Sequence, residues 1–287
     1  MVVTIGCPSR VVLVTGAAGG LGSVMVRALL SDGHHVAAVD ADAAALERLR
    51  ESLGCPPSLH AIDCDLATPD ACREAVRATA AAFGTLHAVI NNAGIGSRQV
   101  PGTLVQSRPA LDEIALDLWD RFFAINTRAP MLLSQAALPF MRAAGWGRIV
   151  NVTTSFRSML NALPYGATKA ALESMSAVWA TQLIELGIAV NVLIPGGPTD
   201  TAFVPEIGMA RASMLRPEIM SPPLRWLVSD NSDGFHGRRI TAARWPAGAV
   251  DLDAARAVSR PIGWPELGAD AVWGHAMVAG NDGRVST

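Results

Sequence analysis

Charge of either sign is scarce in this 287-residue chain, of which 17% is charged, and the formal net charge is −2. Nucleic-acid-binding domains usually carry a basic patch, so this balance argues against nucleic acid as a partner. Half of the residues are hydrophobic, which excludes a disordered chain, because disordered chains have too little apolar surface to offset their ordering entropy. We therefore expect a globular protein with a sizeable core.

A long hydrophobic run is also lacking. Residues 11–26 are uncharged but contain four glycines, and residues 129–141 are uncharged for thirteen positions only. A membrane span needs roughly twenty apolar residues. The first residues have neither a basic region nor an apolar one, as a secretory signal would. We expect a soluble, cytoplasmic protein that has no membrane partner.

Cysteine and histidine are few and badly spaced for metal binding. No Cys-x-x-Cys pair occurs among Cys7, Cys55, Cys64 and Cys72. We expect reduced thiols and no bound metal. The pair His34-His35 has no ligand partners at useful spacing, and we interpret it as part of a turn or surface.

Short β-rich segments alternate with longer helical stretches. Seven segments are predicted strands: 10–15, 35–40, 59–63, 88–91, 148–153, 189–194 and 239–242. This alternation is typical of right-handed βαβ units, and residues 11–14 are apolar on both faces, as in a buried parallel strand. We predict an α/β fold, a doubly wound parallel seven-stranded sheet with helices on both faces (Rossmann fold), as a single domain over residues 1–243.

Two segments exceed what such a sheet needs. Residues 244–287 form a C-terminal extension with Trp245, Trp264 and Trp273, which favour a segment packed on the domain or at a subunit interface. Residues 95–109 form a long loop, and loops of that length are often functional.

Residues 15–22 follow the first predicted strand and open a helix. The predicted cofactor residues of this loop are Gly16, Gly19, Gly20, Leu21 and Gly22. Gly16 permits a tight turn, Gly20 lets the backbone approach a pyrophosphate, and Gly22 lets the helix pack closely on the sheet. Free N–H groups at the helix start then bind phosphate. A glycine-rich turn without a ligand is the alternative, and the strand–turn–helix context favours dinucleotide binding.

Asp40 ends the second predicted strand. A carboxylate there accepts hydrogen bonds from a ribose diol and repels a 2′-phosphate. No Arg or Lys in residues 41–45 or in the glycine loop offsets that charge. We therefore predict NAD as the cofactor, with NADP less favoured. Two alternatives are that Asp42 takes this role and that Asp40 caps a helix.

Tyr165 is the one tyrosine of the chain, and Lys169 stands four residues after it, on the same face of a predicted helix. A phenol has an ordinary pKa near 10 and is a poor base at neutral pH, so it needs a neighbouring cation. This pair follows the fifth predicted strand, at the edge of the sheet where α/β proteins bind ligands.

These motifs together resemble the short-chain dehydrogenases/reductases over residues 10–243. The resemblance rests on residues 15–22, Asp65-Leu66, residues 91–94, Asn126, the Tyr165/Lys169 pair and Pro195-Gly196. The family implies NAD(P)-dependent interconversion of alcohols and carbonyls on a small-molecule substrate. We therefore expect an NAD-dependent oxidoreductase acting on a secondary alcohol or ketone.

The resemblance also implies roles for single residues. Tyr165 would be the general acid/base, Lys169 would bind the nicotinamide ribose and lower the pKa of Tyr165, and Asn126 would hold a water that relays protons. The implied cofactor contacts are Asp65 and Leu66 at the adenine, Asn92, Ala93 and Gly94 beneath the cofactor, and Pro195, Gly196 and Thr199 at the nicotinamide. Thr201 is an alternative to Thr199, because Gly197 and Pro198 shift the register.

One departure concerns the serine that the family usually places after the fifth strand. Strand register puts Thr154 at that position and Ser155 one residue later. Both carry the hydroxyl needed to bind the substrate oxygen, and both are retained as candidates.

The substrate itself is less well indicated. Apolar residues that would lie over it are Phe203, Met209, Met214, Leu215 and Met220, and they favour a hydrophobic substrate unless they simply pack on the domain. Cations that would instead bind a carboxylate are Arg98, Arg108, Arg157 and Arg211.

Residues 114–141 and 164–186 are predicted long helices that are apolar on more than one stripe, so we expect a homodimer or homotetramer. Two alternative functions are a catalytically weak NAD(H)-binding sensor or scaffold, and a nucleotide-sugar epimerase, which suits a longer chain.

Overall fold

The computed structural model describes residues 8–96, 109–204, 209–248 and 250–266. One sheet has the strand order β3-β2-β1-β4-β5-β6-β7-β8. Its strands are β1 (Val11–Thr15), β2 (His35–Asp40), β3 (Leu59–Asp63), β4 (Ala88–Asn91), β5 (Gly147–Val152), β6 (Ile188–Ile194), β7 (Arg238–Thr241) and β8 (Ser259–Pro261). Strands β1 to β7 are parallel, which confirms the predicted doubly wound α/β fold.

The prediction of seven strands was wrong by one. Strand β8 pairs antiparallel with β7 and forms one edge of the sheet. It belongs to the C-terminal extension, residues 244–287, which was expected to lie outside the sheet. It has three residues, Ser259, Arg260 and Pro261, and two of them are exposed. So short a polar strand has no hydrophobic alternation, and a proline is tolerated because the strand lies at an edge. The sequence therefore offered no periodic signal for it.

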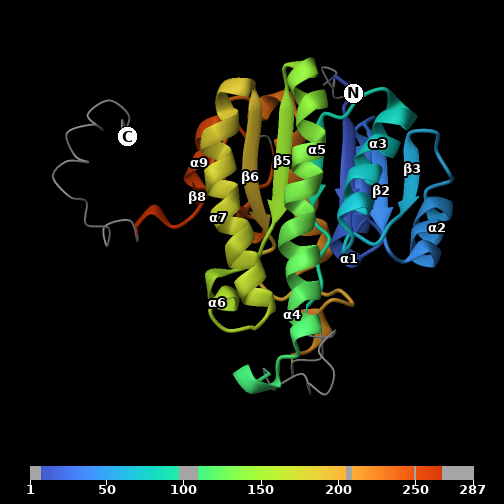
Figure 1. Cartoon of the computed structure of the whole chain (residues 1–287). Helices are drawn as coiled ribbons and strands as arrows, with labels where there is room; N and C mark the ends of the chain where they lie inside the picture. The colour runs from blue at the N-terminus through green and yellow to red at the C-terminus, as the bar shows by residue number, and fades with distance from the viewer. Residues whose placement is uncertain (1–7, 97–108, 205–208, 249, 267–287) are drawn as a thin grey trace, which may run out of the picture.

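Helices cover both faces of the sheet (Figure 1). On one face lie α3 (Pro69–Phe83), α5 (Ala129–Ala144) and α7 (Tyr165–Leu183), and on the other α1 (Gly20–Ser31), α2 (Ala43–Ser52) and α8 (Ser221–Val228). Side chains alternate along β1: Val12 and Val14 join the core under α1, whereas Val11 and Leu13 join the core under α3 and α5. A strand buried on both faces must be apolar throughout.

The first predicted long helix is interrupted. Helix α4 (Leu116–Phe123) continues through one π-helical turn, Ala124–Arg128, into α5. Single π-turns within helices occur frequently at functional sites. This turn contains Asn126, a predicted site residue.

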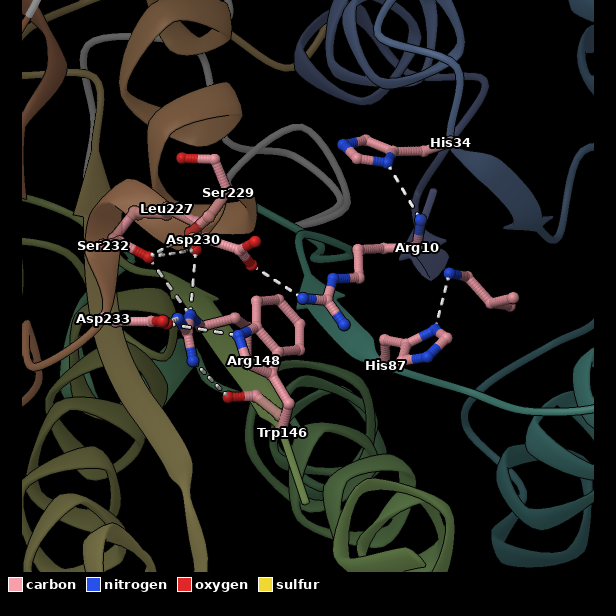
Figure 2. A network of polar contacts seen from close by, with 12 residues as sticks. Arg10, His34, His87, Trp146, Arg148, Leu227, Ser229, Asp230, Ser232 and Asp233 are labelled. Carbon is pink, nitrogen blue, oxygen red and sulfur yellow. Dashed lines mark hydrogen bonds and ion pairs between the residues drawn. The ribbon is translucent and has the colours of Figure 1, made fainter. Parts of the chain in front are cut away.

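The amino-terminal edge of the sheet is closed by a polar network (Figure 2). The Arg10 and Arg148 guanidinium carbons lie 3.9 and 4.0 Å from the centre of the Trp146 ring. Arg10 pairs with Asp230 over 2.7 Å, and Arg148, almost fully buried, pairs with Asp233. The network connects the starts of β1 and β5 to the segment after α8. It lies at the amino-terminal ends of the strands, whereas the predicted site lies at their carboxyl ends.

His34 belongs to this edge, where it follows the turn between α1 and β2, and only its interpretation as a surface residue was wrong. It is 2% exposed, and its Nδ1 accepts a hydrogen bond from the Arg10 backbone N–H over 3.1 Å. His87 does the same for Val11 over 2.9 Å (Figure 2). Burial lowers the pKa of both rings, which suits neutral imidazoles that accept hydrogen bonds.

The described part of the C-terminal extension packs on the fold. After Trp245, whose ring centre lies 5.4 Å from that of Trp226, the chain forms α9 (Leu252–Ala257) and then β8. Trp264 contacts Phe156 with 5.1 Å between ring centres. Trp273 lies outside the described residues, as do residues 97–108 of the predicted long loop and Cys7.

Three cysteines of the described chain, Cys55, Cys64 and Cys72, are free thiols. Within the described residues no group of acidic, His and Cys side chains has the arrangement of a metal site. None of the helices described here has the length and hydrophobicity of a bilayer span.

Candidate active site

The carboxyl ends of the central strands surround a cavity of about 890 Å³. It is lined by every predicted site residue except one: Gly16, Gly19, Gly20, Leu21, Gly22, Asp40, Asp65, Leu66, Asn92, Ala93, Gly94, Thr154, Ser155, Tyr165, Lys169, Pro195, Gly196 and Thr199. The exception is Asn126. One cavity therefore joins the glycine loop to the Tyr165/Lys169 pair.

Glycine is required in the loop because backbone atoms approach closely. Gly16 has φ of +60°, and a Cβ there would lie 2.9 Å from the Ala93 Cα. A Cβ on Gly22 would lie 1.9 Å from the Gly16 carbonyl oxygen. Helix α1 begins here with Gly19 as its N-cap and has no side-chain cap, so its first N–H groups can bind an anion. The loop thus forms a cradle that suits a pyrophosphate.

Asp40 lies at the rim of this cradle. Its Oδ2 accepts a hydrogen bond from the Ala18 N–H over 2.9 Å, so the carboxylate also braces the glycine loop. The N-cap of α2 is Asp42, whose side chain accepts from the Ala45 N–H over 2.8 Å. Of the two alternatives, capping therefore belongs to Asp42, and Asp40 is the one that lines the cavity.

Asn92 supports the loop from β4. Its Nδ2 donates to the carbonyls of Thr15 and Gly16 over 2.8 and 3.1 Å. The Thr15 hydroxyl accepts from the N–H groups of Asn92 and Ala93, each over 3.0 Å. These contacts connect the ends of β1 and β4, where the strand order of a doubly wound sheet reverses.

Tyr165 and Lys169 extend from the first turns of α7 into the cavity. Burial raises the pKa of Tyr165 to about 12, and a side-chain hydrogen bond with Thr154 acts in the opposite direction. Burial lowers the pKa of Lys169 to about 8, and its ammonium donates to the Val152 carbonyl over 2.9 Å. The expected lowering of the Tyr165 pKa by Lys169 is thus not found, because desolvation dominates and the ammonium bonds to β5.

The two hydroxyl candidates after β5 differ in what they contact. The Thr154 side chain lies beside Tyr165, where it acts against the effect of burial on the phenol pKa. The Ser155 hydroxyl accepts from the Ser158 N–H over 3.1 Å and caps the short helix α6 (Phe156–Met159). The geometry therefore favours Thr154, rather than Ser155, as the hydroxyl beside Tyr165.

Asn126 lies behind the cavity wall and is fully buried. Its Oδ1 accepts from the Ile95 N–H over 2.8 Å, while its Nδ2 donates to the Ile95 carbonyl and the Thr168 hydroxyl, each over 3.0 Å. A Cβ on Gly94 would lie 3.2 Å from Asn126 Oδ1 and 3.4 Å from Lys169 Nζ. Asn126 thus holds the chain after β4 beside Lys169.

Thr199 and Thr201 both line the cavity and are nearly buried. A Cβ on Gly20 would lie 2.4 Å from the Thr201 Cγ2, so the segment after β6 touches the glycine loop. Neither threonine is preferred over the other by these contacts.

Of the apolar residues expected over the substrate, only Phe203 lines the cavity, with its ring centre 5.7 Å from that of Tyr165. Met214 and Met220 are buried in the domain, as the alternative interpretation held. Among the four arginines, Arg157 lines the cavity, whereas Arg211 donates to the Thr201 and Val204 carbonyls. Arg98 and Arg108 lie outside the described residues.

Sequence reasoning missed Glu173 and Arg239. They form a buried ion pair that contacts Thr153 and Thr154. A signal for Glu173 existed: it stands eight residues after Tyr165 and four after Lys169, so all three share one helix face. Arg239 lies on another strand, far along the chain, and had no such signal.

Comparison with known proteins identifies the family of the chain. The family described as short chain dehydrogenase matches residues 10–211. D-threitol dehydrogenase from Mycolicibacterium smegmatis is 32% identical over 202 residues, which are 69% of this chain and 72% of that protein. A short-chain type dehydrogenase/reductase from Mycobacterium marinum has a TM-score of 0.70 at 25% identity, over 81% of this chain and 93% of its own.

A second solved structure, 3-ketoacyl-(acyl-carrier-protein) reductase from Brucella melitensis complexed with NADH, has the same fold. Its TM-score is 0.67 at 23% identity, over 87% of this chain and 98% of its own. The resemblance drawn from the motifs is confirmed, and the chain belongs to the short-chain dehydrogenase/reductase family of oxidoreductases.

Proposed function

We propose that this protein is an NAD-dependent oxidoreductase that interconverts a secondary alcohol and a ketone. The observation that carries the proposal is the single cavity that joins the glycine cradle to Tyr165, Lys169 and Thr154. Relatives named as dehydrogenases of threitol, galactose and hydroxysteroids support a small-molecule substrate. Their names do not agree on one substrate class.

Each residue has a role that follows from its position. A bound nicotinamide would exchange the hydride with the substrate carbon. The Tyr165 phenol is protonated at neutral pH, as a phenol with an ordinary pKa near 10 is, and donates its proton to the carbonyl oxygen during reduction. Thr154 hydrogen-bonds that same oxygen, and Lys169 binds the nicotinamide ribose. Asn126 orders the wall beside Lys169 for the proton relay.

The test is nicotinamide absorbance with NAD(H) and NADP(H) across secondary alcohols and ketones. Turnover that depends on Tyr165 supports the proposal. NADH binding with no turnover of any compound supports the alternative of a binding protein.

Replacing Thr154 by Ala is expected to lower kcat by about 100-fold, because a hydrogen bond to the developing oxygen charge is lost. Thr154→Ser, which keeps the hydroxyl, is expected to retain most activity. Ser155→Ala is expected to change kcat little and to lower the free energy of unfolding by about 1 kcal/mol, since it removes the α6 cap. Steady-state kinetics and thermal unfolding of the three variants check this. Equal losses for Thr154→Ala and Ser155→Ala would contradict the assignment.

Asp40→Asn removes the charge and keeps an acceptor for the Ala18 N–H, but it gives up the acceptor that Asp40 Oδ1 offers to the Asp42 N–H over 3.1 Å. We expect the preference for NAD over NADP to shrink by roughly tenfold, which corresponds to about 1.4 kcal/mol of lost repulsion. The ratio of kcat/KM for the two cofactors measures it. The control is Asp42→Asn, which changes the N-cap of α2. An equal change in the cofactor ratio for this control would contradict a role of Asp40 in the preference for NAD.

We also propose that the chain forms a homodimer or homotetramer. Apolar side chains remain exposed on or beside the long helices: Leu111, Leu116, Met131, Val178 and Leu186. A helix that is apolar beyond its core-facing stripe favours a further partner. A mass of one chain in light scattering would contradict this.

A further inference from the structure

A buried ion pair bonds to the chain just after β5, at Thr153 and Thr154. Glu173, in α7, is fully buried, and the side chain of Arg239, in β7, is 10% exposed. Arg239 Nη1 donates to Glu173 Oε2 over 2.5 Å. Neither residue lines the cavity, so neither reaches a bound substrate from its place in this structure.

Both partners bond to the chain at the end of β5. The Thr153 hydroxyl donates to Glu173 Oε2 over 2.8 Å and accepts from Arg239 Nη1 over 3.2 Å. Arg239 Nη2 donates to the Thr154 carbonyl over 2.5 Å. The pair therefore holds the side chain of one threonine and the main chain of the next.

We propose that Glu173 and Arg239 are positioning residues, which fix the chain at Thr153 and Thr154 and so direct the Thr154 hydroxyl at Tyr165. The catalytic consequence rests on the proposed function, whereas the geometric one does not. Two elements meet at this point, because Glu173 shares a helix face with Tyr165 and Lys169, and Arg239 belongs to a strand two places from β5.

The stability of the fold does not by itself explain why a buried ion pair occupies this position. Replacing a buried ion pair by apolar side chains is often neutral or stabilising, because two charges must be desolvated to bury it. Here Glu173 Oε1 is also buried without a hydrogen-bond partner in the described structure, which adds to that cost. Catalytic groups, in contrast, must be held to about 0.5 Å of their productive geometry. A planar guanidinium that bonds to Glu173, Thr153 and Thr154 at once meets that need.

The test uses Arg239→Lys, which keeps the charge but cannot span these acceptors, and the double variant Glu173→Leu/Arg239→Met, which leaves no unpaired charge. The full-length protein is used throughout. We expect kcat to fall by about 100-fold in both, as for a misplacement of about 1 Å, while KM for NADH stays within a few-fold. The double variant is expected to unfold at nearly the wild-type temperature.

A spectroscopic readout avoids dependence on any substrate. Because the chain has one tyrosine, protein labelled with ¹³Cζ-tyrosine gives a single ring signal that reports the Tyr165 hydroxyl. Thr154→Val supplies the signal position without the Thr154 hydrogen bond. We expect the double variant and Arg239→Lys to shift toward that position.

Arg148→Lys is the matched control, since Arg148 also bonds carbonyls and an aspartate but lies at the opposite edge of the sheet. It is expected to lower the unfolding temperature and leave the tyrosine signal unchanged. A tyrosine signal that stays at the wild-type position in a folded double variant overturns the proposal, as does wild-type kcat there. Failure of the proposed function alone would leave the tyrosine shift intact, so the two failures are distinguishable.

Discussion

Replacing Tyr165 by Phe is expected to lower kcat by about 10³-fold while NADH affinity changes only a few-fold. The substitution removes one hydroxyl and keeps the ring, whose centre lies 5.7 Å from that of Phe203. The proton source for the substrate oxygen is lost, and the hydroxyl of Thr154, which also lines the cavity, is too weakly acidic to replace it.

The control for Tyr165→Phe is to show that the variant remains folded and binds NADH. Tyr165 has one side-chain hydrogen bond that affects its pKa, with Thr154, so we expect the unfolding temperature to stay within a few degrees of wild type. NADH titration and thermal unfolding check this beside the kinetics. A Tyr165→Phe protein that binds NADH and keeps more than about a tenth of the wild-type kcat would remove Tyr165 from the mechanism.

Gly22→Ala is expected to abolish measurable cofactor binding. The added Cβ would lie 1.9 Å from the Gly16 carbonyl oxygen and 2.8 Å from the Ala17 Cα. Both are backbone atoms, so no side-chain rotation relieves the overlap, and the glycine loop must move away from α1. Overpacking of this kind costs about 1–3 kcal/mol of folding free energy, and the displaced loop no longer presents its N–H groups to a phosphate.

The matched control is Ser23→Ala in the same helical turn, which removes a hydroxyl and adds no atom against the loop. We expect Ser23→Ala to bind NADH as wild type does. Titration of NADH against both variants separates the two outcomes. Gly22→Ala that binds NADH within a few-fold of wild type would show that the loop tolerates the displacement, and the cradle would then not explain cofactor binding.

The placement of the Tyr165/Lys169 pair and of the glycine loop was predictable because their spacing is local. Tyr165 and Lys169 are four residues apart, and helical geometry alone puts them on one face. The loop follows an apolar strand and precedes a helix, and this order carries the signal. The choice between Thr154 and Ser155 was different, because one residue of register decides which hydroxyl meets Tyr165 and which caps α6.

The effect of burial on single side chains also could not be predicted from the sequence. From spacing alone, Lys169 was expected to lower the pKa of Tyr165, yet burial raises it to about 12. Desolvation depends on every atom packed around a group, and these come from elements that are distant in the chain. Burial also decided between the two interpretations of Met214 and Met220. They were candidates to lie over the substrate or to pack on the domain, and both are buried in the domain.

By itself the sequence determined the parallel α/β fold, the family, and the positions of the glycine loop and the Tyr165/Lys169 pair, because periodicity and short-range motifs encode them. Only the tertiary structure decided contacts that no local pattern specifies: the pairing of β8 with β7, the choice of Thr154 beside Tyr165, and the Glu173–Arg239 pair. Arg239 lies 66 residues along the chain from Glu173, and no local pattern specifies which side chain so far away forms the pair.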